Sequence, residues 1–181
     1  FVDFKFLPLH IILMAPIEPS PENSHEVLYR LYRLILSKYA DLINEKEKRT
    51  IGEVKALINA NDLTIQSLAG RFKKERFVFE NDFLDCAQKA FGFVSDEIFF
   101  AKSDVRLSYW LSPKEILEFK VADDEDQSVF LCSLLAALGD KNAQVVIAEM
   151  DDLNTHAFVI TEFGGRFFLL DPVLHHDFFE F

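Results

Sequence analysis

Three residues in the second half of the chain, Asp124, His156 and Asp171, are of types that take part in acid–base and nucleophilic chemistry. Asp124 lies at the start of a helical pattern, His156 follows 32 residues later, and Asp171 follows after another 15 residues. An acyl-transfer site consists of a nucleophile, a histidine beside it, and a third group that orients the histidine. A carboxylate is a poor nucleophile toward amides, so Asp124 is not suited to attack an amide as a serine or cysteine would.

Neither cysteine is placed to supply a thiol. Cys132 lies eight residues beyond Asp124, which is about 12 Å along a helix at 1.5 Å per residue. The backbone N–H groups that lower the pKa of a thiol are at the helix N-terminus, roughly two turns away. Cys86 lies on an earlier helix. We therefore expect two free, buried thiols, no disulfide and a reducing compartment.

Short motifs surround these residues and follow one another along the chain. They are Tyr109–Leu117 with its Ser-Pro-Lys-Glu segment, Asp123–Gly139, Thr155–Val159 with His-Ala-Phe, and Arg166–Pro172 with Leu-Asp-Pro. In this order they resemble the core of the transglutaminase-like superfamily, which has papain-like topology and carries Gly-Asp-Cys, Leu-Gly, His-Ala-Trp and Leu-Asp-Pro. The resemblance covers residues 81–173. It implies an α+β fold in which a central helix packs on a small antiparallel sheet.

The resemblance aligns Asp124 with the nucleophilic cysteine of the family, without a gap between Ala122 and Gly139. Three positions depart further from the family pattern: Ala122 replaces a glycine, Phe158 replaces a tryptophan, and Gln144 stands where arginine is frequent. Alanine in place of glycine restricts the loop whose N–H groups would face a substrate oxyanion. The resemblance thus implies a cysteine-hydrolase scaffold whose thiol is replaced by a carboxylate.

Three roles are open to Asp124. As a permanent anion it would pair with His156, with Asp171 on the other side of the ring, in a set that is inert toward amides. As an acid or base it would work with His156 in a different hydrolysis. As a metal ligand it would belong to a set suited to a divalent ion, together with His156, Asp171 and Asp123 or Asp126. We predict the first role, a degenerate triad with no metal and no cofactor.

The elements before residue 81 are predicted to be mainly helical. Alternating apolar residues predict a short strand over residues 2–6, and a proline-rich linker follows. Ser24 precedes an apolar helical stretch that ends in the charged run 45–49. Thr50 and Thr64 are candidate caps of two shorter helices, which reach about residues 59 and 73.

We divide the chain into an N-terminal strand and linker (1–21), a helical region (22–80) and a transglutaminase-like domain (81–181). The helices within residues 22–75 are expected to form a cap on the main domain. A module that docks a partner or serves in assembly is the alternative.

The domain itself is predicted to contain helices and then strands. A helix covers residues 83–94, a short helix is capped by Ser112 with Pro113 in its first turn, and the central helix is capped by Asp123 or Asp124 and ends at Gly139. Alternation predicts strands over 143–148, 156–161 and 167–170, with a hairpin turn at Phe163–Arg166.

Composition limits the partners of the protein. The chain has 181 residues and a net charge of −11, which disfavours nucleic acid and anionic membranes as general partners and is compatible with a cationic peptide. No apolar run reaches the roughly 18–20 residues of a membrane span, so the cytoplasm is the default location. We predict a non-catalytic module, a pseudoenzyme, that binds a peptide or protein segment. The alternative is a peptidase- or amidase-like hydrolase using Asp124, His156 and Asp171, with or without a metal.

Overall fold

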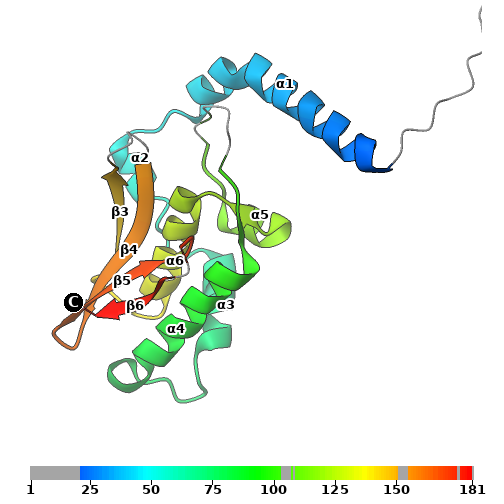
Figure 1. Ribbon diagram of the computed structural model, residues 1–181. Helices are drawn as coiled ribbons and strands as arrows, with labels where there is room; N and C mark the ends of the chain where they lie inside the picture. The colour runs from blue at the N-terminus through cyan, green and yellow to red at the C-terminus, as the bar shows by residue number, and fades with distance from the viewer. Residues whose placement is uncertain (1–20, 103–106, 108, 151–154, 175, 181) are drawn as a thin grey trace, which may run out of the picture.

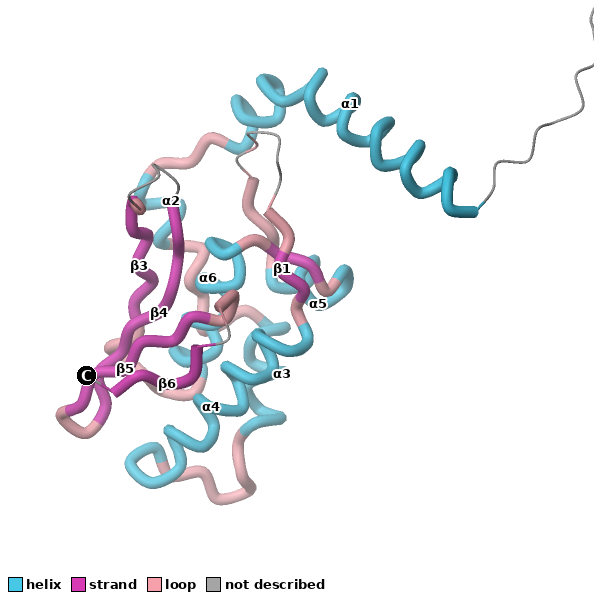
Figure 2. Tube along the Cα trace, in the orientation of Figure 1, coloured by secondary structure: helices cyan, strands magenta, loops and turns pink. Residues whose placement is uncertain are grey.

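The protein is built around a central helix, α6, that lies between an antiparallel sheet on one side and helices α3 and α4 on the other (Figures 1 and 2). The structure is a computed structural model, and it describes residues 21–102, 107, 109–150, 155–174 and 176–180. The strand predicted over residues 2–6 and most of the linker after it lie outside the described residues.

Helices dominate the chain as far as α6, with two short strands among them, and four strands follow. The helices are α1 (Pro21–Glu47), α2 (Ile51–Lys55), α3 (Leu63–Phe72), α4 (Phe79–Glu97), α5 (Pro113–Phe119) and α6 (Asp124–Ala137). The strands are β1 (Phe99–Phe100), β2 (Val121–Ala122), β3 (Gln144–Glu149), β4 (Thr155–Phe163), β5 (Arg166–Asp171) and β6 (His176–Glu180). The predicted α+β class, with a central helix on a small antiparallel sheet, is confirmed.

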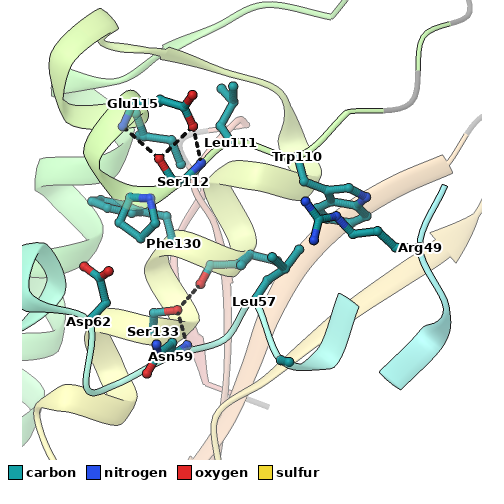
Figure 3. Close-up of a pocket in the computed structure, with 14 residues that line it drawn as sticks. Arg49, Leu57, Asn59, Asp62, Trp110, Leu111, Ser112, Glu115, Phe130 and Ser133 are labelled. Carbon is teal, nitrogen blue, oxygen red and sulfur yellow. Dashed lines mark hydrogen bonds between the residues drawn. The ribbon is translucent and has the colours of Figure 1, made fainter. Parts of the chain in front are cut away.

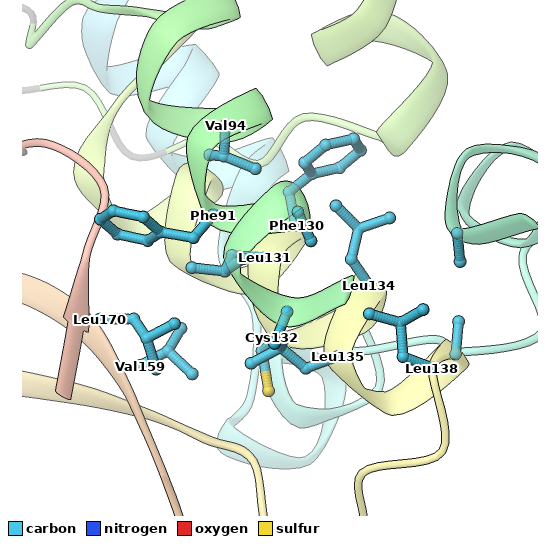
Figure 4. Packing of buried hydrophobic residues seen from close by; sticks show 14 of the residues in the cluster. Phe91, Val94, Phe130, Leu131, Cys132, Leu134, Leu135, Leu138, Val159 and Leu170 are labelled. Atoms are coloured by element: carbon cyan, nitrogen blue, oxygen red, sulfur yellow. The ribbon is translucent and has the colours of Figure 1, made fainter. Parts of the chain in front are cut away.

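Helix α6 is central because it is apolar on most of its faces, as its sequence predicts. Phe130, Leu131, Leu134 and Leu135 are at most 1 % exposed. They pack together with buried side chains of α3, α4 and the sheet in one core, part of which is drawn in Figure 4. Burying a side chain of this size contributes about 1.5–3 kcal/mol relative to leaving it in water, so these residues of α6 contribute strongly to the stability of the fold.

The ends of α6 are fixed by local hydrogen bonds. At the N-terminus, the side chain of Asp123 caps the helix and accepts a hydrogen bond from the backbone N–H of Asp126. At the C-terminus, Gly139 has a φ of +109°, its N–H donates to the carbonyl of Ala136, and the N–H of Asp140 donates to that of Leu135. These two bonds form a Schellman motif, which turns the chain toward the sheet.

The sheet has the strand order β3-β4-β5-β6, and every neighbouring pair is antiparallel. The predicted hairpin turn joins β4 to β5, where Gly164 and Gly165 have φ values of +62° and +75°. Positive φ at both central residues is typical of a type I′ turn, whose twist matches that of the strands. All three predicted strands are present. The fourth strand, β6, was not predicted, because the His-His-Asp segment before its apolar residues resembles a solvated tail.

The predicted caps are partly correct. Thr50 forms a capping box with Glu53 at the start of α2, and Ser112 forms one with Glu115 at the start of α5. Thr64 is not a cap: the side chain of Asp62 caps α3 and accepts the N–H of Thr64. Aspartate takes this position because its carboxylate reaches two backbone N–H groups at once.

Helix α1 differs from the other helices in its surroundings. Most of its large apolar side chains are 37–66 % exposed, and it lies away from the core in Figure 1. α3, by contrast, contributes Ile65 and Leu68 to the core. No helix among the described residues is long and apolar enough to cross a membrane. The division of the chain at residues 21 and 80 remains a prediction.

Gly139 and Gly70 offer a matched pair of substitutions that tests how α6 ends. A Cβ at Gly139 would lie 3.1 Å from Phe79 at a strongly positive φ, whereas a Cβ at Gly70, within α3, meets nothing within 4 Å. Gly139→Ala should lower the free energy of unfolding by about 1–3 kcal/mol. Gly70→Ala should leave it unchanged or raise it by about 0.5–1 kcal/mol. Urea unfolding measures both, and equal effects would contradict this role of Gly139.

Candidate functional site

The structure brings Asp124, His156 and Asp171 together. The Nδ1 atom of His156 lies 3.2 Å from Oδ2 of Asp124, and its Nε2 atom lies 2.7 Å from Oδ2 of Asp171. Asp124 and Asp171 are 3 % and 4 % exposed, while the histidine side chain is 20 % exposed. The imidazole ring is therefore held between two buried carboxylates.

Each of the three residues is placed by the end of an element. Asp124 is the first residue of α6, His156 is the second residue of β4, and Asp171 is the last residue of β5. β4 pairs with β5 in the same sheet, and α6 packs against β4. The side chain of Asp171 is fixed further because its Oδ1 accepts the N–H groups of Val173 and Leu174, both at 3.1 Å.

Asp124 is also tied to the sheet through the backbone. Its Oδ2 accepts the N–H of Ala157 at 3.0 Å in addition to facing His156. A hydrogen bond from a buried N–H to an ionised oxygen is stronger than a neutral one. The carboxyl group thus joins the N-terminus of α6 to β4, because His156 and Ala157 both belong to that strand.

The two ring contacts constrain where protons lie. An ionised carboxylate only accepts hydrogen bonds, and a neutral imidazole has one N–H. If His156 were neutral and both aspartates ionised, one ring nitrogen would face an oxygen with no hydrogen between them. The two contacts therefore require a second hydrogen within the set, carried by the ring or by one of the two carboxyl groups.

A lysine that the sequence did not single out lies beside Asp124. Lys102 Nζ lies 3.9 Å from Oδ1 of Asp124 and donates a hydrogen bond to the carbonyl of Thr155 at 3.1 Å. Its ammonium group places a positive charge next to the carboxyl group of Asp124. Lys102 has no motif around it, since it comes from the irregular segment after β1, and only the folded chain brings it to α6.

The first turn of α6 also holds a buried acid. Asp126 is 2 % exposed, its Oδ1 accepts the N–H of Leu111 at 3.1 Å, and its Oδ2 has no partner among the described residues. Burial, reinforced by the charge of Asp123, raises the pKa of Asp126 to about 8. Burial likewise raises the pKa of Tyr109, near the same carboxylates, to about 12. Asp126 is therefore a mainly neutral carboxylic acid near neutral pH.

Both cysteines are core thiols, as predicted. Cys132 is fully buried on α6, and burial raises its pKa to about 12. Cys86 is also fully buried, its pKa is raised by burial, and its thiol donates to the carbonyl of Phe72. Neither thiol lies in the triad, so neither replaces the thiol that the resemblance assigns to position 124.

The proposed metal role finds no support in the coordination geometry. Among the described residues, no group of three or more histidine, cysteine, aspartate or glutamate side chains is arranged to hold a metal ion. Both ring nitrogens of His156 face carboxylates, which leaves no ring lone pair directed at a cation.

Two cavities flank α6. The first, of about 290 Å³, lies between α6, α5 and the segment around α2 and includes Leu57, Trp110 and Phe130 (Figure 3). The second, of about 260 Å³, lies between the C-terminal end of α4, β1, α6 and the turn after β5, and includes Gln127, Pro172 and Val173. The second cavity is lined by Pro172, which follows Asp171, and by Gln127, which lies one turn beyond Asp124 on α6, but not by Asp124, His156 or Asp171.

Comparison with known proteins gives similarity at the level of the structure. LapG of Legionella pneumophila after EGTA treatment is 18 % identical, with 67 % of this chain and 74 % of that chain covered and a TM-score of 0.45. The calcium-bound form of the same protein is 14 % identical, with 73 % and 82 % covered and a TM-score of 0.44. No protein-family model and no curated protein matches the chain significantly. Both TM-scores are below 0.5, so the structural similarity is partial.

Removing the carboxylate of Asp124 should destabilise the fold. Asp124→Ala leaves the N–H of Ala157 and a ring nitrogen of His156 without their partner, and breaking a buried pair in this way costs about 3–5 kcal/mol. Asp124→Asn keeps an acceptor and should cost less. Asp85→Ala, which removes an exposed carboxylate paired with Lys89, is the control and should cost at most about 1 kcal/mol. Chemical denaturation measures the stability of all three variants. Equal stability of Asp124→Ala and the wild type would show that the contacts of Asp124 with His156 and Ala157 do not stabilise the fold.

The raised pKa of Asp126 predicts a pH dependence of stability. Between an ordinary aspartate pKa of about 4 and about 8, the folded chain keeps a proton that the unfolded chain releases. This contribution to stability is fully present below about pH 4 and is lost as the pH rises toward 8. Relative to Asp126→Asn, the wild type should therefore lose up to about 1.4 kcal/mol of unfolding free energy per pH unit in this window. Urea unfolding across the window, with Asp85→Asn as control, tests this; parallel curves for wild type and Asp126→Asn would contradict it.

Proposed function

We propose that this protein is a transglutaminase-like domain that lacks the catalytic cysteine and binds a peptide or protein segment without cleaving it. The observation that carries the proposal is the state of Asp124. Its carboxylate occupies the position that the resemblance assigns to the nucleophile, yet it is 3 % exposed and engaged by His156 and the N–H of Ala157. A carboxyl group that is buried and held by these contacts has a structural role and does not act as a nucleophile.

The remaining parts of the scaffold support a binding role. His156 and Asp171 have the mutual geometry of a histidine and its orienting carboxylate, and the ring of Phe158 lies beside the imidazole at a tilt of 39°, with ring centroids 6.2 Å apart. A cavity is lined by Pro172, the residue that follows Asp171. The net charge of −11 favours a ligand with positive charge, since opposite charge accelerates encounter and suppresses acidic competitors.

A defined set of synthetic peptides distinguishes binding from catalysis. The wild type and Asp124→Cys are each incubated with the peptides, and mass spectrometry records which peptides are retained and which are cleaved. We expect the wild type to retain some peptides and to cleave none. Asp124→Cys places a thiol beside His156 at the N-terminus of α6, where a lowered thiol pKa is favoured, and should cleave at least some of the retained peptides.

The control is Asp124→Cys combined with His156→Ala, which should lose the cleavage because the thiol no longer has its base. Cleavage by the wild type that disappears in Asp124→Asn would overturn the proposal. That result would favour the alternative, a hydrolase in which Asp124 and His156 act as acid and base.

A further inference from the structure

Helix α1 carries an apolar surface that is largely uncovered in the described part of the chain. Ten of its large apolar side chains are 37–66 % exposed, and α1 packs extensively against no other described element. Figure 1 shows it extending away from the helices and the sheet that form the core. A helix in a protein owes most of its stability to the packing of its apolar face. A helix of 27 residues that is exposed in this way therefore needs a partner surface.

The apolar side chains at the centre of this surface follow a seven-residue pattern. They succeed one another at alternating steps of four and three residues and form one stripe along the helix, the α1 stripe, which consists of Leu28, Tyr32, Ile35, Tyr39 and Leu42. These five side chains are 43–58 % exposed. The same alternation lets two helices pack side by side, because each side chain enters a space between side chains of the facing helix. The pattern thus favours a second helix as the partner of α1.

The opposite side of α1 is polar and forms its contacts within the helix. Glu26 and Arg30 make an i, i+4 ion pair at 2.8 Å, and Ser37 lies on the same side, two turns beyond Arg30. Residues 21–47 contain four basic and five acidic side chains. α1 therefore lacks the excess of lysine and arginine by which amphipathic helices bind anionic membrane surfaces. This charge balance favours a protein surface over a lipid surface as the partner.

The exposed area of α1 matches what a stable dimer requires. Large side chains have about 150–250 Å² of surface each, so ten that are about half exposed present roughly 900 Å². A monomeric protein rarely exposes a contiguous apolar patch of more than about 300–600 Å². A stable interface of standard size buries about 800 Å² on each partner. A second copy of this chain supplies an identical apolar helix of the required size.

From these observations we infer that two copies of this chain associate through α1, with the α1 stripe of one copy packed against the α1 stripe of the other in antiparallel orientation. Two identical surfaces that pair about a two-fold axis close on themselves, so the assembly stops at a dimer. The surface is separate from the triad and from the cavities beside α6, so this inference and the proposed function do not depend on each other.

The antiparallel orientation follows from two features of α1. Only residues 48–50 link α1 to α2, so a parallel pair would bring the folded parts of both copies to the same end of the helices and against each other. An antiparallel pair places them at opposite ends, about 40 Å apart at 1.5 Å per residue. It also sets each tyrosine of the stripe opposite a leucine or isoleucine, as with Leu28 opposite Tyr39 of the partner subunit. Large and smaller side chains then alternate and interdigitate.

Sedimentation equilibrium of the full chain over a range of micromolar concentrations tests the association. The wild type should reach about twice the mass of one chain, which is 20.9 kDa. Ile35→Glu places a carboxylate at the centre of the stripe, where the symmetric pair buries it twice, and should raise the dissociation constant of the dimer about a hundredfold or more. Ser37→Glu adds the same group to the polar side and should leave the dissociation constant unchanged. The amide NMR shifts of α3, α4 and α6 should be the same in all three proteins, which excludes unfolding as the cause.

Disulfide cross-linking tests the orientation. Cys86 and Cys132 are fully buried, so a single cysteine introduced into α1 can be oxidised selectively. Leu28→Cys and Tyr39→Cys are mixed and oxidised, and mass spectrometry identifies which chains are joined. An antiparallel pair joins Leu28→Cys chains to Tyr39→Cys chains, whereas a parallel pair joins Leu28→Cys chains to one another. Ser37→Cys, on the polar side, is the control and should stay unlinked.

Several results would overturn the inference. They are a wild type that stays monomeric at all concentrations, equal dissociation constants for Ile35→Glu and Ser37→Glu, and disulfides between Leu28→Cys chains alone. A monomer that binds vesicles of phosphatidylcholine and phosphatidylglycerol through α1 would assign the helix to a lipid surface instead. A monomer that dimerises only after residues 1–20 are deleted would show that this segment of the same chain covers α1. Either of these two outcomes also rejects the second copy as the natural partner.

Discussion

The carboxylate of Asp124 is the point at which the helical half of the protein meets the sheet. It belongs to α6 in sequence, but its partners, the ring of His156 and the N–H of Ala157, belong to β4. A buried anion is tolerated only when its charge and its lone pairs are satisfied. The first turn of α6 must therefore stay where β4 can reach it, and the positions of Asp171 and Lys102 follow from the same requirement.

Apolar packing and this polar contact fix different properties of the fold. The leucine and phenylalanine side chains of α6 supply most of the burial, but an apolar surface tolerates rotation and sliding of a helix at modest cost. Hydrogen bonds between charged groups do not, because small displacements break them. The Schellman motif at Gly139 and the type I′ turn at Gly164 and Gly165 set the direction of the chain at the far ends of the same elements.

Much of this arrangement was accessible from the sequence, and what was missed has physical reasons. The helix over Asp124–Ala137, the three strands after it and the proximity of Asp124, His156 and Asp171 follow from periodicity and motif order. Lys102 and the buried acid Asp126 were not assigned their roles, since a lone charged residue in an irregular segment or a helix cap gives no periodic signal. The cap of α3 was misplaced by two residues because Asp62 and Thr64 are both good capping residues, and only the folded backbone decides between them.

The carboxylate at position 124 also has a genetic consequence. Aspartate and cysteine codons differ at both of their first two bases, so single-base changes from one to the other pass through glycine or tyrosine. Glycine would leave the N–H of Ala157 and the ring of His156 without a partner. Tyrosine would have to enter a position that is 3 % exposed and closely packed. Each intermediate would fold less well than the chain with aspartate, so the contact that holds α6 to the sheet also makes a stepwise exchange of this aspartate for cysteine costly.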